Sequence, residues 1–123
     1  MKIVSISEDI NIEKRIAITP EIAKKYLSSG FDVSIVENYG QHLGFSDNEY
    51  KELGVQISKD EKKIINEANI IVQMGLLSDE KLSFLKENQN LIGVLNPYLN
   101  KEKIKNLNKK KVNSFSLELL PRI

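Results

Sequence analysis

Lys2–Ser7 (KIVSIS), residues 19–30 (TPEIAKKYLSSG) and Asp32–Glu37 (DVSIVE) follow one another at the start of the chain. The two outer segments are short and rich in β-branched residues, which favours buried strands. In the middle segment, Thr19 can cap the free N–H groups of a helix and the proline after it suits the first helical position. Gly30 supplies the left-handed conformation that ends many helices. This stretch therefore predicts a strand, a helix and a second strand.

The same alternation continues to the end of the chain. Further helices are expected to begin at Ser46 and Ser58, each of which has a glutamate three residues later as in a capping box, and at Ser78. The segments expected to be extended are Val55–Ile57, Ile70–Met74, Leu91–Leu95 and Val112–Leu117, with a lysine-rich helix over about Lys101–Asn108 before the last of them. Apolar strands that alternate with helices indicate a mostly parallel sheet covered on both faces. We expect a single α/β domain with a doubly wound, Rossmann-like or flavodoxin-like layout.

The composition excludes several classes of function. The 123 residues leave room for one compact domain, and 41% hydrophobic with 28% charged residues is an ordinary globular mixture. The formal charge of +1 gives no field that would attract nucleic acid. The absence of cysteine excludes disulfides, and a single histidine makes a site for a transition metal improbable. No stretch approaches the roughly 20 apolar residues of a membrane span.

A nucleotide site does not follow from the pattern of elements alone. The first strand leads into SEDINIEKR (residues 7–15), and the chain contains neither the G-x-G-x-x-G fingerprint nor a Walker A motif. Arg15 lies in this connection, at the edge of the sheet where ligands of such folds bind, and its guanidinium suits a carboxylate or phosphate. The alternative is that Arg15 is solvated or ties down its own loop.

Other charged residues have simpler interpretations. His42 lies in a loop between glycines without an evident acidic partner, so we interpret it as a surface or loop-packing residue. The lysines at 101, 103, 105, 109, 110 and 111 lack interleaved aromatic residues for base stacking, and they are expected to form a solvated helix face. Arg122, in the final segment ELLPRI (residues 118–123), follows the carboxyl end of the last expected strand, where ligands bind in open sheets.

Four segments in order resemble one family, the N-terminal domain shared by alanine dehydrogenases and nicotinamide nucleotide transhydrogenases. They are EKRIAITPE (residues 13–21), GFSDNEY (residues 44–50) followed by Gly54, EANIIVQM (residues 67–74) and LIGVLNPY (residues 91–98). The resemblance covers essentially the whole chain without large gaps. Each motif alone is weak, and their ordered combination is specific.

The branch of this family is decided by two positions. Alanine dehydrogenases carry a lysine and a histidine that hold and protonate the keto acid, and the matching positions here are Gly75 and Asn96. Neither residue supplies a titrating group. The ending with Pro-Arg-Ile instead resembles the transhydrogenase alpha subunit.

The resemblance implies hydride transfer between NAD(H), held by the alpha subunit, and NADP(H), held by a partner subunit, coupled to proton translocation. It implies Arg122, Ile123 and Arg15 as cofactor-binding residues, with Arg122 at the nicotinamide carboxamide or a phosphate oxygen and Arg15 supporting the cleft between domains. The implied partners are a dinucleotide-binding domain absent from these 123 residues, the membrane and beta subunits, and a second copy in a homodimer. The implied location is cytoplasmic, peripheral to the inner membrane through those subunits, and the fragment alone is expected to be inactive.

Two alternatives stay open. One is an alanine dehydrogenase-like amino-acid dehydrogenase with altered catalytic residues, and the other is a non-catalytic interaction module. A glycine-rich dinucleotide fingerprint encoded downstream of Ile123 would favour an enzyme, and a stop codon there would favour the module.

Overall fold

The computed structural model describes residues 1–117, and it confirms the predicted α/β fold. Within these residues six parallel strands form one sheet in the order β3-β2-β1-β4-β5-β6. The strands are β1 (Lys2–Ser5), β2 (Asp32–Val36), β3 (Gln56–Ser58), β4 (Ile70–Val72), β5 (Asn90–Gly93) and β6 (Asn113–Ser116). The chain first builds outward from β1 to β3 and then returns to build β4 to β6 on the other side, so the strand order reverses between β1 and β4.

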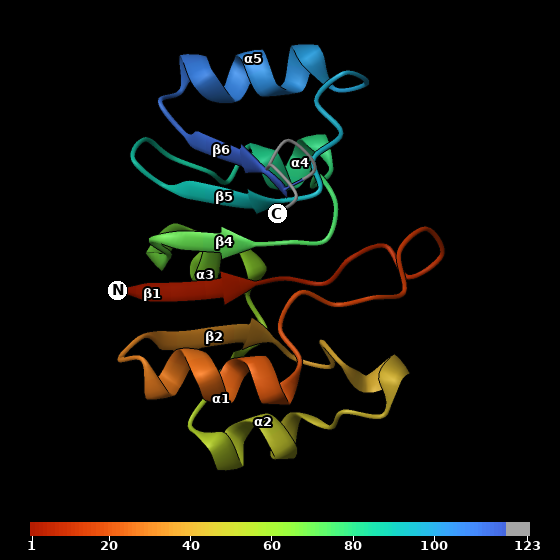
Figure 1. Ribbon diagram of the computed structural model, residues 1–123, viewed down its shortest axis with the longest axis vertical. Helices are drawn as coiled ribbons and strands as arrows, with labels where there is room; N and C mark the ends of the chain where they lie inside the picture. The colour runs from red at the N-terminus through yellow and green to blue at the C-terminus, as the bar shows by residue number, and fades with distance from the viewer. Residues whose placement is uncertain (118–123) are drawn as a thin grey trace, which may run out of the picture.

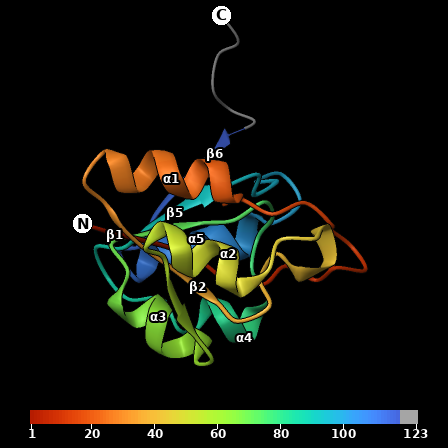
Figure 2. The same ribbon diagram turned by 90° about the horizontal axis from the view of Figure 1, so that it is seen from below.

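Helices connect successive strands and lie on both faces of the sheet (Figures 1 and 2). They are α1 (Pro20–Ser28), α2 (Asp47–Leu53), α3 (Glu61–Glu67), α4 (Asp79–Leu82) and α5 (Lys101–Lys109), with a short 3-10 turn, η1 (Gln41–Leu43). In Figure 1, α1 lies in front of the sheet, α3 and α4 lie behind it, and α5 runs along the β6 edge. All strands point the same way, so their carboxyl ends share one edge.

The helix boundaries follow the predicted caps with one exception. Thr19 and Ser46 accept hydrogen bonds from N–H groups in the first turns of α1 and α2, and Gly30 has the expected positive φ of 91°. The predicted start of α3 at Ser58 is wrong by two residues. Ser58 is the last residue of β3, and Asp60 caps the helix by accepting from the N–H of Lys63 at 3.1 Å.

The first strand is shorter than the predicted Lys2–Ser7, for a physical reason. The backbone N–H and C=O of Ile6 are hydrogen-bonded to the side chain of Gln73, at 2.8 and 3.1 Å, rather than to a neighbouring strand. Ile6 is nevertheless fully buried. The hydrogen-bond ladder of the strand therefore ends at Ser5. The side chain of Gln73 takes the place of a neighbouring strand for the backbone of Ile6.

One face of the sheet is covered unevenly. Four side chains lie on the same face of the sheet, those of Ile3, Ile70, Ile92 and Phe115. They do so because paired residues of neighbouring strands point to the same side, as do residues two positions apart in one strand. Ile3 is buried, Ile70 and Ile92 are partly exposed, and Phe115 is 53% exposed. Figure 1 shows no helix of the described residues in front of β4, β5 and β6. The front layer is thus complete over β1 and β2 and open over β6.

A close backbone contact makes Gly93 a sensitive position. A Cβ atom there would lie 2.4 Å from the carbonyl oxygen of Gln73. We expect Gly93→Ala to force β5 away from β4 and to lower the free energy of unfolding by about 2 kcal/mol, as overpacking does. Urea denaturation measures this. Gly75→Ala is the control, because a Cβ at Gly75 meets nothing within 4 Å. Equal stability of the two variants would contradict the prediction.

Candidate functional site at the carboxyl edge of the sheet

A buried tyrosine hydroxyl organises the edge where β1 and β2 end. The hydroxyl of Tyr39 accepts hydrogen bonds from the backbone N–H groups of Ala17 and Ile18, both at 3.1 Å, and donates to Oγ of Ser5 at 2.8 Å. Burial raises the pKa of Tyr39 to about 12, so the hydroxyl keeps its proton. The chain before α1 is thereby fixed against the end of β1.

Gln73 plays the matching role after β4. Its Oε1 accepts from the N–H of Ile6, and its Nε2 donates to the carbonyl oxygen of the same residue. Ser5 completes the connection by donating from Oγ to the carbonyl oxygen of Val72 at 2.6 Å. These bonds satisfy polar groups that are buried away from water, which would otherwise destabilise the fold. They also set the direction in which the loop after β1 leaves the sheet.

A crevice of about 240 Å³ opens next to this network. It lies at the point where the strand order reverses, which is the usual ligand position in open parallel sheets. Its volume is below the roughly 300–1,000 Å³ typical of small-molecule sites. The lining residues come from the loops after β1, β4 and β5 and from the start of α5: Glu8, Asp9, Ile12, Glu13, Gly75, Leu76, Val94, Leu95, Asn96, Asn100 and Lys103.

Glu8 is a residue of this crevice that the sequence pattern did not single out. Its Oε1 accepts hydrogen bonds from the backbone N–H groups of Met74 and Gly75, so it holds the turn after β4. Burial raises the pKa of Glu8 above its usual value of 4.5, against the opposing effect of those hydrogen bonds. Its position shortly after the first strand, at the edge of a parallel sheet where ligands bind, is the feature of the sequence that could have predicted it.

Arg15 lies at the predicted edge of the sheet, but its partner is in its own loop. Its Nε and Nη2 donate to the two carboxylate oxygens of Glu13 at 3.1 and 2.7 Å. Hydrogen bonding to this guanidinium lowers the pKa of Glu13 to about 2. Glu13 lines the crevice, whereas Arg15 does not and its side chain is 72% exposed. A contact between Arg15 and a cofactor stays a prediction.

The structure brings together the two positions that the resemblance matches to the lysine and histidine of alanine dehydrogenases. Gly75 and Asn96 both lie in the crevice wall. Open space surrounds the position of a Cβ at Gly75, so packing does not enforce glycine there. The crevice lining also carries three carboxylates, on Glu8, Asp9 and Glu13, against one ammonium, on Lys103, and the guanidinium of Arg15 balances Glu13. Its charge therefore opposes a carboxylate or phosphate ligand.

The remaining candidates lie elsewhere. His42 is outside the crevice lining and donates from Nε2 to the carbonyl oxygen of Lys14 at 2.7 Å, which confirms it as a loop-packing residue. Five of the six lysines on and after α5 are exposed, as predicted, and Lys103 is half-buried. Lys103 and Lys110 also contact α4. Arg122 and Ile123 lie outside the described residues.

Residues 1–117 contain no cluster of three or more metal-ligating side chains. None of the helices described over the same residues has the length and apolar character needed to span a membrane.

The chain folds as an α/β domain with a crevice where the strand order reverses. The profile of the family described as "Alanine dehydrogenase/PNT, N-terminal domain" matches residues 5–123. The chain is 40% identical over its whole length to an NAD(P) transhydrogenase subunit alpha protein of Rickettsia prowazekii (strain Madrid E), and covers 33% of that protein. It is 31% identical over 90% of its length to the NAD(P) transhydrogenase subunit alpha of Haemophilus influenzae, of which it covers 21%.

Solved structures agree with these sequence relatives. A transhydrogenase from Sinorhizobium meliloti superposes with a TM-score of 0.89 at 27% identity, covering 98% of this chain and 36% of that one. An L-alanine dehydrogenase gives 0.87 at 21% identity, with 94% and 32% covered, which shows the shared fold. The chain belongs to the alanine dehydrogenase/transhydrogenase N-terminal domain family. It spans between about a fifth and a third of the length of these relatives.

The Tyr39 hydroxyl provides a direct test of the buried network. Tyr39→Phe leaves the N–H groups of Ala17 and Ile18 without their acceptor, and we expect it to lower the free energy of unfolding by about 2 kcal/mol. Chemical denaturation measures the loss. Tyr98→Phe is the control, because Tyr98 is 77% exposed and its change is expected to stay within about 0.5 kcal/mol. A Tyr39→Phe variant as stable as this control would argue against the network.

The raised pKa of Glu8 predicts a specific pH dependence of stability. The folded chain holds the Glu8 proton at pH values where the unfolded chain has lost it, so protonation of Glu8 favours folding. This contribution is complete below the ordinary pKa and is lost as the pH rises through the raised value. Glu8→Gln is uncharged throughout. We therefore expect the stability of the wild type relative to Glu8→Gln to fall as the pH rises from about 4 to 7.

Urea denaturation of both proteins across this pH range makes the comparison. Glu87→Gln removes an exposed carboxylate with the same change in net charge and serves as the control. A wild-type advantage that grows with pH would reverse the predicted sign and exclude this role for Glu8.

Proposed function

We propose that this chain forms one wall of the NAD(H) site in the alpha subunit of a proton-translocating NAD(P) transhydrogenase. The observation that carries the proposal is the crevice where the strand order reverses, whose wall contains Gly75 and Asn96 in a chain 40% identical to a transhydrogenase alpha subunit. The NADP(H) that exchanges hydride with NAD(H) would be held by a partner subunit. The nicotinamide rings would supply the redox chemistry, and the residues of this chain would position one of them.

The charge of the crevice fits the nicotinamide end of the dinucleotide. That end is neutral or cationic and carries an amide N–H₂ group, which can donate to a carboxylate. Glu8, Asp9 and Glu13 offer such acceptors, and the same groups repel the pyrophosphate. The phosphates would then be held by the dinucleotide-binding domain, since this sequence has no glycine fingerprint.

Exposed apolar side chains at the crevice support a covering domain. Ile12 and Val94 line the crevice and are 85% and 40% exposed, and Tyr98 and Leu99 in the loop after β5 are also exposed. Large apolar groups gathered at one edge are typical of a surface that another polypeptide covers. We assign this edge to the dinucleotide-binding domain of the same subunit, with Arg122, Ile123 and Arg15 at the cleft between the two domains.

The larger assembly follows from the same proposal. The alpha subunit would act as a homodimer at the cytoplasmic side of the inner membrane, attached through its membrane and beta subunits. Its family relatives are named as subunits of NAD(P) transhydrogenase, which supports partners of this kind.

Titration with NADH tests the incomplete site. Because this chain has no tryptophan, the fluorescence of NADH itself reports binding. We expect no saturable binding at micromolar concentrations to these 123 residues, and micromolar binding to a longer protein that includes the dinucleotide-binding domain. Arg122→Ala in the longer protein is expected to weaken binding about tenfold, the loss of one charged hydrogen bond. Micromolar binding by the 123 residues alone would disprove the partial-site interpretation.

The same longer protein distinguishes the alternatives. Reduction of NAD⁺ that depends on alanine would identify an amino-acid dehydrogenase, against the absence of a titrating group at Gly75 and Asn96. A longer protein that binds neither NADH nor NADPH would identify a non-catalytic module.

A further inference from the structure

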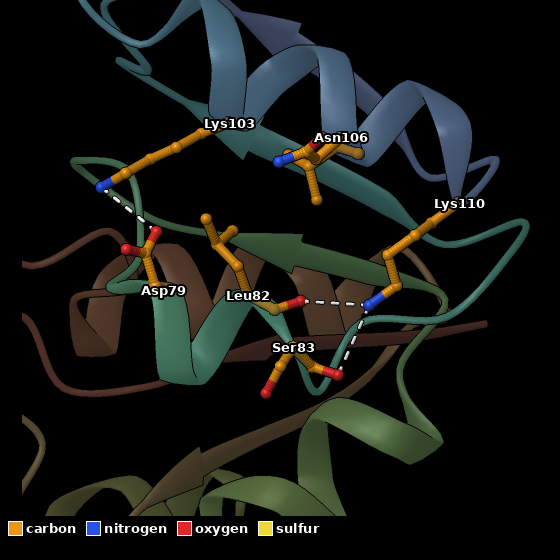
Figure 3. Close-up of a pocket in the computed structure, with 7 residues that line it drawn as sticks. Asp79, Leu82, Ser83, Lys103, Asn106 and Lys110 are labelled. Atoms are coloured by element: carbon orange, nitrogen blue, oxygen red, sulfur yellow. Dashed lines mark hydrogen bonds and ion pairs between the residues drawn. The ribbon is translucent and has the colours of Figure 1, made fainter.

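A second hollow lies between α4 and α5, away from the crevice (Figure 3). Its volume is about 410 Å³, within the range of small-molecule sites and larger than the crevice. It is lined by Asp79, Leu82, Ser83, Lys103, Asn106, Leu107 and Lys110. Only Lys103 belongs to the lining of both.

The face that α5 turns toward α4 differs from an ordinary packing surface. Lys103, Asn106, Leu107 and Lys110 are spaced at i, i+3, i+4 and i+7, which places them on one stripe of the helix. Such a stripe is normally apolar where two helices pack. Here only Leu107 is apolar, and a hollow lies between the lysine contacts that join the two helices.

The two lysines close the ends of the hollow. Lys103 Nζ lies 3.5 Å from Oδ1 of Asp79 at one end. At the other end Lys110 Nζ donates to the carbonyl oxygens of Leu82 and Ser83 at 3.5 and 3.4 Å, where α4 ends. An ammonium has three donors, so Lys110 keeps one for a ligand. The charge of Lys103 is balanced by its carboxylate partner, whereas Lys110 contacts neutral carbonyl groups.

The middle of the hollow combines an apolar floor with an amide. Leu82 and Leu107 are buried, and Figure 3 shows the side chain of Leu82 pointing toward α5. The side chain of Asn106 extends into the gap, one helical turn from Lys110. Its amide makes no hydrogen bond with another residue of the described portion of the chain. The hollow therefore holds an amide in its middle and an ammonium at one end, beside an apolar surface.

We propose that this hollow binds a small amphipathic monoanion, an aromatic carboxylate. The carboxylate accepts hydrogen bonds from Lys110 Nζ and the Asn106 amide, and the ring lies on Leu82 and Leu107. The lining carries two ammonium groups and one carboxylate, so its single excess positive charge matches one negative charge. The site is independent of the NAD(H) proposal.

Benzoate is the probe, followed by backbone amide shifts of the ¹⁵N-labelled chain in NMR spectra. We expect saturable shifts at Leu82, Ser83, Leu107 and Lys110, with a Kd of about 1 mM. Benzamide has the same shape without the charge and is expected to bind about tenfold more weakly, because a charged hydrogen bond is lost. Glu8 and Gly75, in the crevice, are expected to show no shift.

Two variants test the assigned groups. Lys110→Met keeps the length of the side chain without its charge, and Asn106→Ala removes the amide; each is expected to weaken benzoate binding about tenfold. Lys109→Met, at an exposed position of the same helix outside the lining, is the control and is expected to leave binding unchanged. Absence of saturable shifts up to about 10 mM, equal binding of benzamide, or equal effects of Lys109→Met and Lys110→Met would each overturn the proposal.

Discussion

The hydrogen bonds among Ser5, Tyr39 and Gln73 are the constraint on which the rest of this structure depends. Three strands end at one edge, and the backbone groups beyond their last ladder bonds are buried. The amide of Gln73 satisfies the backbone groups of Ile6 after β1, and the hydroxyl of Tyr39 bonds Ser5 and the backbone before α1, at 2.8 to 3.1 Å. An apolar side chain at either position would leave donors or acceptors without partners in a medium where that is costly.

The chemistry of the candidate site follows from this constraint. Because Ile6 is held by Gln73, the loop after β1 leaves the sheet in a defined direction and presents Glu8 to the turn after β4. The Glu8 carboxylate occupies the two N–H groups that could otherwise hold an anionic ligand. Acidic side chains line this wall, and neither a lysine nor a histidine stands at positions 75 and 96, which agrees with the proposed nicotinamide ligand.

The sequence predicted those features of the structure that are encoded locally. Caps at Thr19 and Ser46 and the glycine at position 30 depend on residues a few positions apart, and all three are confirmed. Ser58 was misassigned because Asp60 offers an equally good cap two residues later. The pairing of Gln73 with Ile6 joins residues 67 positions apart, and no periodicity reports such a contact. Arg15 was placed at the correct edge, and its pairing with Glu13, two positions earlier, agrees with the alternative that Arg15 ties down its own loop.

Because one face of the sheet is covered unevenly, the two halves of the domain are expected to differ in stiffness. From Ile3 to Phe115 the same face passes from a sealed interior to a surface in contact with water. On this face the half around β1 is buried, whereas β6 is exposed within the described residues. Any polypeptide that settles on the open half would stiffen β5 and β6 first. The domain would thus register the arrival of a neighbour as a local loss of motion beside the loop after β5, which lines the crevice.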